Sequence, residues 1–169
     1  MNTTTTIYAK SQEDTKHIAT QIAAFLDLGD ILVLVGGLAA GKTQFVKSLA
    51  HALGSTDRVT SPTFTIANFY DLPKGKLLHI DTYRLETIQH YRHLGLEEYY
   101  SESINVLEWG DKVATDLATY LRIEIGFVQS DHEEERSFQF SYVGDQWAGR
   151  IADMMNHLKS YQSSSQNEQ

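Results

Sequence analysis

The sequence contains no cysteine, and this absence excludes two kinds of structure. Disulfide bonds cannot form, and a metal site held by thiolates cannot be built. The fold must therefore be stabilised by a hydrophobic core. With 169 residues, 41% of them hydrophobic, the chain is long enough for one such core and short for two.

Long apolar runs are also missing. The most apolar uninterrupted run, residues 31–35, is far shorter than the ~20 residues that cross a bilayer. Residues 1–6 show neither the basic nor the apolar part of a secretory signal. We therefore expect a cytoplasmic protein with no membrane association.

Positive charge is scarce, since the formal net charge is −8. A protein that binds a nucleic-acid backbone by itself usually presents a basic face. Direct, strong RNA or DNA binding is thus disfavoured, and a basic surface shared with a partner stays open. The densest group of basic and imidazole side chains comprises Arg84, His90, Arg92 and His93.

Strand and helix periodicities alternate along the chain. We expect strands at 5–9, 31–35, 63–70, 76–81, 104–108, 121–128 and 136–143. We expect helices at 12–28, 42–53, 84–93, 111–119 and 147–158. This order predicts an α/β fold: a mainly parallel sheet flanked by helices, with a C-terminal β-hairpin and helix. Residues 1–159 would form a single domain, and the polar segment 160–169 would be disordered.

One segment carries a specific chemical signal. Residues 36–43 read Gly-Gly-Leu-Ala-Ala-Gly-Lys-Thr and fit the phosphate-binding pattern G-x-x-x-x-G-K-[ST]. Backbone N–H groups of such a loop surround phosphates, the lysine reaches the β- and γ-phosphates, and the hydroxyl of the last residue ligates magnesium. An apolar strand precedes the segment and a helical pattern follows it, as this function requires. The sequence therefore predicts a P-loop NTPase fold that binds a nucleoside triphosphate with Mg²⁺.

Two expected strands end in carboxylates, Asp81 and Glu108. Ligands of open α/β sheets bind at the carboxyl ends of strands, so both side chains are candidates for the site. Asp81 can hold magnesium directly or through water, and Glu108 can orient the attacking water or act as a base. The sequence does not decide which carboxylate has which role.

Other polar and aromatic residues near these motifs are less decisive. Thr60-Ser61-Pro62-Thr63-Phe64 occupies the position where many P-loop proteins sense the γ-phosphate, and it also fits an ordinary Ser-Pro turn. Trp109 can stack on a base, contact a partner or simply pack. His79 lacks a second histidine at metal spacing, so we assign it no catalytic role.

The absence of certain motifs limits which nucleotide and which reaction we expect. The sequence has no Asn-Lys-x-Asp segment of the kind that reads guanine, which favours ATP over GTP. Its arginines are dispersed and form no lid of the kind that small-molecule kinases close over their acceptor. Hydrolysis is thus favoured over phosphoryl transfer.

Taken in order, these blocks resemble the TsaE (YjeE) family of bacterial ATPases that act in making N6-threonylcarbamoyladenosine in tRNA. The resemblance covers about residues 10–125. It is carried by five blocks: 36–43, 60–64, His-Ile-Asp-Thr-Tyr-Arg-Leu at 79–85, Leu-Gly-Leu-Glu-Glu at 94–98, and Glu-Trp at 108–109.

The resemblance implies a role in another enzyme's chemistry. TsaB and TsaD would transfer the threonylcarbamoyl group to adenosine 37 of tRNA, and TsaC would supply the activated precursor. This chain would be the ATPase that regulates the TsaB–TsaD complex, and it would meet tRNA only through its partners. Its ATP-dependent docking on the pair would be changed by hydrolysis.

The resemblance also implies roles for individual residues. Lys42 and Glu108 would be catalytic, and Thr43, Asp81 and Glu108 would hold Mg²⁺. The residues that would contact ATP are Gly36, Gly37, Leu38, Ala39, Ala40, Gly41, Lys42, Thr43, Gln44, Thr60, Ser61, Thr63 and Trp109.

The loop departs from the family's usual Gly-Asp/Glu-Leu-Gly-Ala-Gly-Lys-Thr at two positions. Gly37 replaces the acid, and Ala39 replaces a glycine. A positive φ at Ala39 would cost ~1 kcal/mol relative to glycine. Two other functions stay open beside the leading one: a module that assembles with partners on ATP binding alone, and a small-metabolite kinase.

Overall fold

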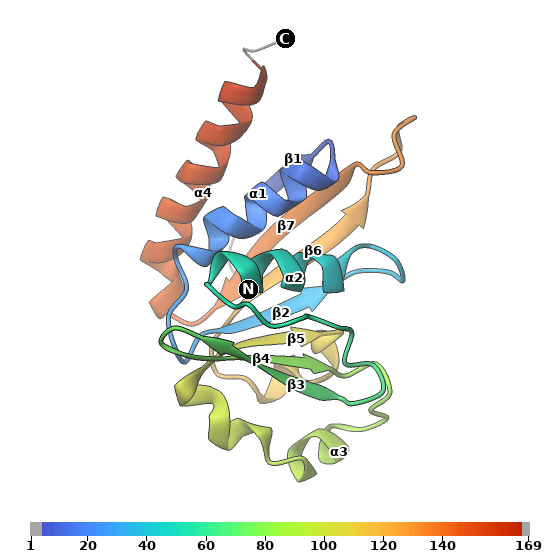
Figure 1. The fold of residues 1–169 in the computed structure, drawn as a ribbon, viewed down its shortest axis with the longest axis vertical. Coiled ribbons are helices and arrows are strands. Elements are labelled where there is room, and N and C mark those ends of the chain that lie inside the picture. Colours follow the sequence, from blue (N-terminus) through green and yellow to red (C-terminus); the bar gives the residue numbers. More distant parts are fainter. Residues whose placement is uncertain (1–4, 167–169) are drawn as a thin grey trace.

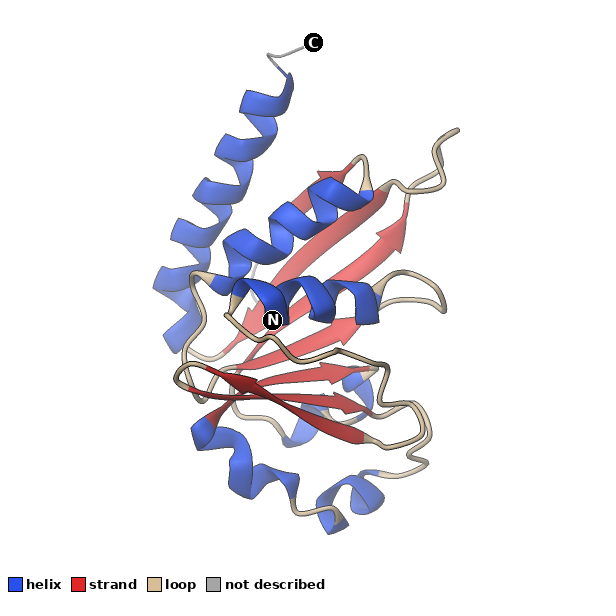
Figure 2. Cartoon of the chain, viewed as in Figure 1, coloured by secondary structure: helices blue, strands red, loops and turns tan. Residues whose placement is uncertain are grey.

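The computed structural model describes residues 5–166, in which a seven-stranded sheet has helices on both faces (Figures 1 and 2). The strands are β1 (Thr5–Ala9), β2 (Ile31–Val35), β3 (Ala67–Leu72), β4 (Gly75–Asp81), β5 (Ser103–Glu108), β6 (Tyr120–Phe127) and β7 (Arg136–Val143). The α-helices are α1 (Gln12–Ala23), α2 (Lys42–Ala52), α3 (Ile88–His93) and α4 (Gln146–Gln166). Three short 3₁₀ helices are η1 (Leu96–Glu102), η2 (Gly110–Lys112) and η3 (Ala114–Asp116).

The strand order is β1-β7-β6-β2-β5-β4-β3. The four central strands β6, β2, β5 and β4 run parallel, whereas β7 and β1 on one side and β3 on the other pair antiparallel. The predicted α/β fold is confirmed, with a parallel centre and antiparallel edges that make the sheet mixed. Because the central strands share one direction, the carboxyl ends of β2, β4 and β5 lie at the same edge of the sheet.

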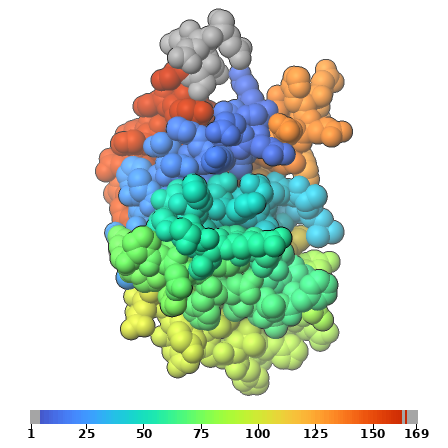
Figure 3. Space-filling view, in the orientation of Figure 1, coloured from blue at the N-terminus to red at the C-terminus, as the bar shows by residue number. Residues whose placement is uncertain are grey.

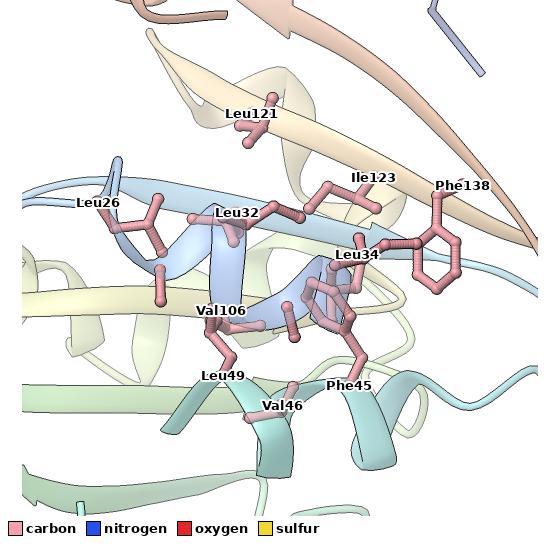
Figure 4. Packing of buried hydrophobic residues seen from close by; sticks show 14 of the residues in the cluster. Leu26, Leu32, Leu34, Phe45, Val46, Leu49, Val106, Leu121, Ile123 and Phe138 are labelled. Atoms are coloured by element: carbon pink, nitrogen blue, oxygen red, sulfur yellow. The ribbon is translucent and has the colours of Figure 1, made fainter. Parts of the chain in front are cut away.

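Strand β2 lies between two hydrophobic layers, as its uninterrupted apolar sequence predicts. Leu32 and Leu34 face the layer built with α1, α2 and α4, where Phe45 and Leu49 of α2 pack against the sheet (Figure 4). The alternate residue Val33 faces a second layer on the opposite side of the sheet. Burial on both faces fixes the strand firmly, and with it the loop that follows.

The helix expected at 12–28 ends at Ala23, and three further expected elements differ from the structure. The strand expected at 63–70 begins only at Ala67, because residues 63–65 form a turn and Ile66 has φ 70°, which no strand residue adopts. The helix expected at 84–93 begins at Ile88, after the N-cap Thr87. The helix expected at 111–119 is replaced by η2 and η3.

The C-terminal segment also differs from its prediction. Disorder is expected from residue 160, yet α4 continues to Gln166. Tyr161 explains part of this extension, because its ring stacks on His17 of α1 at 3.6 Å and its hydroxyl donates to Asp14. The last three positions of the expected disordered tail, 167–169, lie outside the described residues.

The chain between α2 and β3 crosses the surface on its way to the edge where β2, β4 and β5 end (Figures 1 and 3). It runs between α2 and the β3–β4 hairpin and carries residues 60–64 to that edge. Within residues 5–166, none of the helices has the length and apolar character needed to cross a bilayer.

Candidate functional site

The loop between β2 and α2 forms the predicted phosphate-binding turn. Gly41 is the N-cap of α2, with φ 103° and no side chain to cap the helix. The first N–H groups of α2 therefore have no side-chain partner at the cap, and the helix dipole adds partial positive charge there. A helix start of this kind binds anions, and phosphate is the anion that the surrounding loop best fits.

Lys42 folds back onto this loop. Its Nζ donates hydrogen bonds to the carbonyls of Gly36 and Gly37, both at 2.8 Å, and lies 4.0 Å from the centroid of the Trp109 ring. Burial lowers the pKa of Lys42, while Glu108 and Asp81 act in the opposite direction. The ammonium thus lies against the loop, where a phosphate can replace the two carbonyls as its hydrogen-bond acceptor.

Asp81 and Glu108 lie next to each other at the ends of β4 and β5. The two residues are paired in the register of these parallel strands, and both are buried. Thr43 Oγ1 donates to Glu108 Oε1 at 2.9 Å, which brings the hydroxyl of the loop to the carboxylate of β5. Asp81 accepts from Thr63 Oγ1 at 2.9 Å and from the Tyr83 N–H at 2.8 Å.

A cavity of about 250 Å³ joins these groups. It is lined by Leu38, Ala39, Gly41, Lys42, Thr43, Gln44, Ser61, Thr63, Asp81, Glu108 and Trp109. Three other predicted loop residues, Gly36, Gly37 and Ala40, do not line it, although the first two contact Lys42 through their carbonyls. Thr60 is also outside the lining: its backbone N–H and C=O bond to the hydroxyl of Tyr70 instead.

The two departures in the loop have different consequences. Ala39 has the positive φ, 62°, that strains an alanine relative to a glycine at this position. At Gly37 a Cβ would meet only the Phe127 ring at 3.8 Å, an ordinary contact. Lack of space for a Cβ therefore does not explain the missing acid at Gly37.

Trp109 forms one wall of the cavity. It has φ 57°, its ring lies 5.0 Å from that of Tyr83, and its carbonyl accepts from Thr82 Oγ1. These contacts and the approach of Lys42 show that the tryptophan packs against the loop lysine.

His79 is a residue that the sequence analysis set aside. It is fully buried on β4, and its Nε2 lies 3.0 Å from Glu108 Oε1. The signal that could have found it is the period of a strand: His79 and Asp81 are two residues apart and so face the same side.

A second cavity, of about 450 Å³, adjoins the loop and involves residues that the sequence analysis missed. It shares Ala39, Gly41 and Gln44 with the first cavity and is completed by the start of α1 and by β7. Arg136 of β7 donates from Nε to the carbonyl of Ala40 at 3.1 Å, which fixes one wall. A larger cavity of about 530 Å³ lies between α1, α2 and residues 54–59, and it contains neither Asp81 nor Glu108.

The donor set fits magnesium with a nucleotide. No group of three His, Cys, Asp or Glu side chains in the described part of the chain could hold a metal by itself. Two carboxylates and a hydroxyl suit Mg²⁺, which keeps several waters and completes its shell with substrate phosphates. A strand, a glycine loop, a helix that begins with Lys-Thr and carboxylates on the adjoining parallel strands define the class: this is a P-loop NTPase fold.

Comparison with known proteins identifies the family within this class. The family described as "Threonylcarbamoyl adenosine biosynthesis protein TsaE" matches residues 9–138, and the chain belongs to it. The resemblance found in the sequence is thereby confirmed.

Individual relatives agree with this family. The Bacillus subtilis "tRNA threonylcarbamoyladenosine biosynthesis protein TsaE" is 37% identical over 146 residues, which cover 86% of this chain and 90% of the relative. The protein of the same name from Treponema pallidum is 41% identical over 113 residues, 66% of this chain and 83% of the relative. The structure described as "Crystal structure of Bacillus subtilus YdiB" matches with a TM-score of 0.75 and 33% identity, over 93% of this chain and 97% of that one.

Proposed function

We propose that this chain binds ATP with Mg²⁺ and hydrolyses it slowly, and that it thereby regulates the TsaB–TsaD complex in tRNA N6-threonylcarbamoyladenosine synthesis. The observation that supports this best is the convergence of Lys42, Thr43, Asp81 and Glu108 on one cavity at the start of α2. TsaC would supply the activated threonylcarbamoyl group, and tRNA would be met only through the partners, in the cytoplasm.

The loop residues would bind and orient the phosphates. Lys42 would exchange the carbonyls of Gly36 and Gly37 for the β- and γ-phosphates, and the N–H groups at the start of α2 would face the same oxygens. Thr43 and Asp81 would hold Mg²⁺, which would neutralise charge on the phosphates. The nucleoside would extend into the 450 Å³ cavity, because that cavity shares Ala39 and Gln44 with the phosphate site.

Glu108 would orient the attacking water and accept its proton. Its carboxylate lies beside Thr43 and lines the cavity, where a water next to the γ-phosphate would be within reach. No arginine is found among the described residues that line this cavity. Without an arginine to stabilise the transition state, intrinsic turnover would be slow and would depend on a partner.

Depletion of the protein in its cell, followed by measurement of threonylcarbamoyladenosine in bulk tRNA, tests the assignment. We expect the modification to fall and to return when the wild-type chain is restored. Unchanged modification would contradict the proposed role.

The same depleted cells distinguish hydrolysis from binding alone. Glu108→Gln removes the base and keeps a group that accepts from Thr43. We expect this variant to bind ATP, to lose turnover and to fail in restoring the modification. Full restoration by a variant without turnover would favour the alternative in which ATP occupancy suffices.

A further inference from the structure

A buried chain of hydrogen bonds runs from the segment at Thr60 to the carboxylate of Glu108. The Tyr70 hydroxyl donates to the Thr60 carbonyl at 3.0 Å and lies 3.4 Å from His79 Nδ1. On the other side of the imidazole, His79 Nε2 lies 3.0 Å from Glu108 Oε1. Both Tyr70 and His79 are buried, whereas Thr60 at the other end of the chain is exposed.

In this chain of hydrogen bonds, the single hydroxyl proton of Tyr70 has two possible acceptors. His79 Nε2 faces a carboxylate and therefore carries the N–H, which makes Nδ1 of the neutral ring an acceptor. The Tyr70 hydroxyl has one proton, and both the Thr60 carbonyl and His79 Nδ1 can accept it. Here the shorter contact is to Thr60, whose N–H also donates to the Tyr70 oxygen at 3.2 Å.

The segment that carries Thr60 is linked to the proposed magnesium site. Three residues further on, the Thr63 hydroxyl donates to Asp81 Oδ2, the carboxylate proposed for magnesium. A cation at Asp81 competes for the oxygen that holds Thr63. The segment ends at Ile66, whose φ of 70° is unfavourable for a β-branched residue and whose carbonyl accepts from the Asp81 N–H. The segment is thus fastened to the site at its far end by a strained residue.

We propose that Tyr70 and His79 are positioning residues that transmit the arrangement of residues 60–63 to Glu108. When the segment withdraws from Tyr70, the hydroxyl rotates from the Thr60 carbonyl to His79 Nδ1. An imidazole that accepts at Nδ1 donates more strongly from Nε2, since successive hydrogen bonds polarise one another. Glu108 is then held by His79 in a fixed orientation. No covalent bond changes, and no proton leaves its atom; the inference rests on the proposed hydrolysis at Glu108.

A purely structural role is the alternative, in which Tyr70 and His79 only satisfy each other as buried polar groups. The variant Tyr70→Phe distinguishes the positioning role from the structural role, because it removes one hydroxyl and keeps the packing of the ring. Tyr91→Phe is the matched control: its hydroxyl is also buried and has no hydrogen-bond partner among the residues that the structure describes.

We expect Tyr70→Phe to lower kcat by roughly fivefold, the effect of one hydrogen bond, with the KM for ATP close to wild type and a lower melting temperature, because buried His79 Nδ1 loses a hydrogen-bond partner. His79→Leu should lower kcat further. The double variant should be no slower than His79→Leu, because both changes interrupt the same chain. His79→Gln, which can donate to Glu108 and accept from Tyr70, should restore part of the rate. An unchanged kcat in Tyr70→Phe, or independent losses in the double variant, would overturn the proposal.

A second measurement separates this proposal from the proposed function. The ring ¹⁵N resonances of His79 are recorded with and without Mg²⁺ and a non-hydrolysable ATP analogue. We expect the Nδ1 resonance to shift with the analogue in the wild type and in Tyr91→Phe, and to stay fixed in Tyr70→Phe. If the wild type has no turnover but shows this Tyr70-dependent shift, the result contradicts only the proposed hydrolysis. If turnover is present and the shift is absent or independent of Tyr70, the result contradicts only the proposed coupling through Tyr70 and His79. If both are missing, both proposals fall.

Discussion

Ala39 holds a backbone conformation that a glycine would adopt without strain. Its φ of 62° lies in the left-handed region, whereas the neighbouring Ala40 is not among the residues with positive φ. We predict that Ala39→Gly raises the free energy of unfolding by about 0.5–1 kcal/mol, because the strain at Cβ exceeds the added freedom of the unfolded chain. Urea denaturation measures this.

Ala40→Gly is the control for that prediction. Ala40 is buried and has an ordinary φ, so glycine there should destabilise the protein by about 0.5–1 kcal/mol. Equal destabilisation by the two substitutions would show that the loop does not strain Ala39.

Lys42 is the one cation among the described residues that line the 250 Å³ cavity. We predict that Lys42→Ala lowers ATP affinity at least ~100-fold, since a charge-assisted contact to phosphate is worth about 3 kcal/mol at a partly buried site. Isothermal titration with Mg²⁺ and ATP measures the change. Lys47→Ala, on the exposed side of α2, should leave affinity within about twofold. Near-normal affinity in Lys42→Ala would show that the nucleotide binds elsewhere.

At the scale of elements, the sequence predicts best where hydrophobic periodicity and burial act together. The strands 5–9 and 136–143 have the predicted bounds, and 31–35 is buried on both faces as its composition indicates. In 111–119, Val113 and Leu117 are buried as helical spacing predicts, but the short connection from β5 to β6 winds into 3₁₀ turns. Periodicity reports which side chains are buried, and the tertiary path decides the type of turn.

In the candidate site, too, local sequence patterns predict some features, and the tertiary structure decides the others. The glycine loop and the two carboxylates could be predicted because strand ends of a parallel sheet meet at one edge. His79 was not assigned, because its contact with Glu108 is made by side chains of two different strands, whose register pairs His79 with Val106 and only Asp81 with Glu108. The walls of the 450 Å³ cavity proposed for the nucleoside come from α1 and β7, which no local pattern connects with the loop.

Helix α4 extends beyond its predicted end, and the stack of Tyr161 on His17 explains part of this extension. We predict that Tyr161→Ala destabilises the protein by about 1 kcal/mol through loss of the stack on His17, and lowers the melting temperature by roughly 2–4 °C. Thermal unfolding followed by circular dichroism measures it. Asn156→Ala, exposed on the same helix, should leave the melting temperature unchanged. No shift in Tyr161→Ala would mean that the end of α4 contributes nothing to the fold.

At the scale of the whole molecule, large apolar side chains are exposed around the proposed site. Phe64 is 84% exposed and Leu38 is 72% exposed, although both adjoin residues that hold the phosphates or the metal in our proposal. A buried core can be completed without them, and exposed apolar groups of this size next to a functional cavity are typical of a surface that a partner covers. The Arg84 guanidinium lies over the Phe64 ring, 5.3 Å from its centroid, within the range of a cation–π contact.

If the partner complex covers this surface, Phe64 contributes to stimulation and not to the basal reaction. We predict that Phe64→Ala keeps ATP affinity and basal turnover within about twofold, while stimulation by TsaB–TsaD falls at least ~10-fold, the effect of one buried aromatic at an interface. Turnover is measured with and without the purified pair. Tyr8→Ala is the control: Tyr8 is 56% exposed on β1, at the opposite edge of the sheet, and its removal should leave stimulation intact. Equal stimulation of wild type and Phe64→Ala would place the docking surface away from the mouth of the nucleotide site, and the regulation would then have to reach Glu108 through the protein interior.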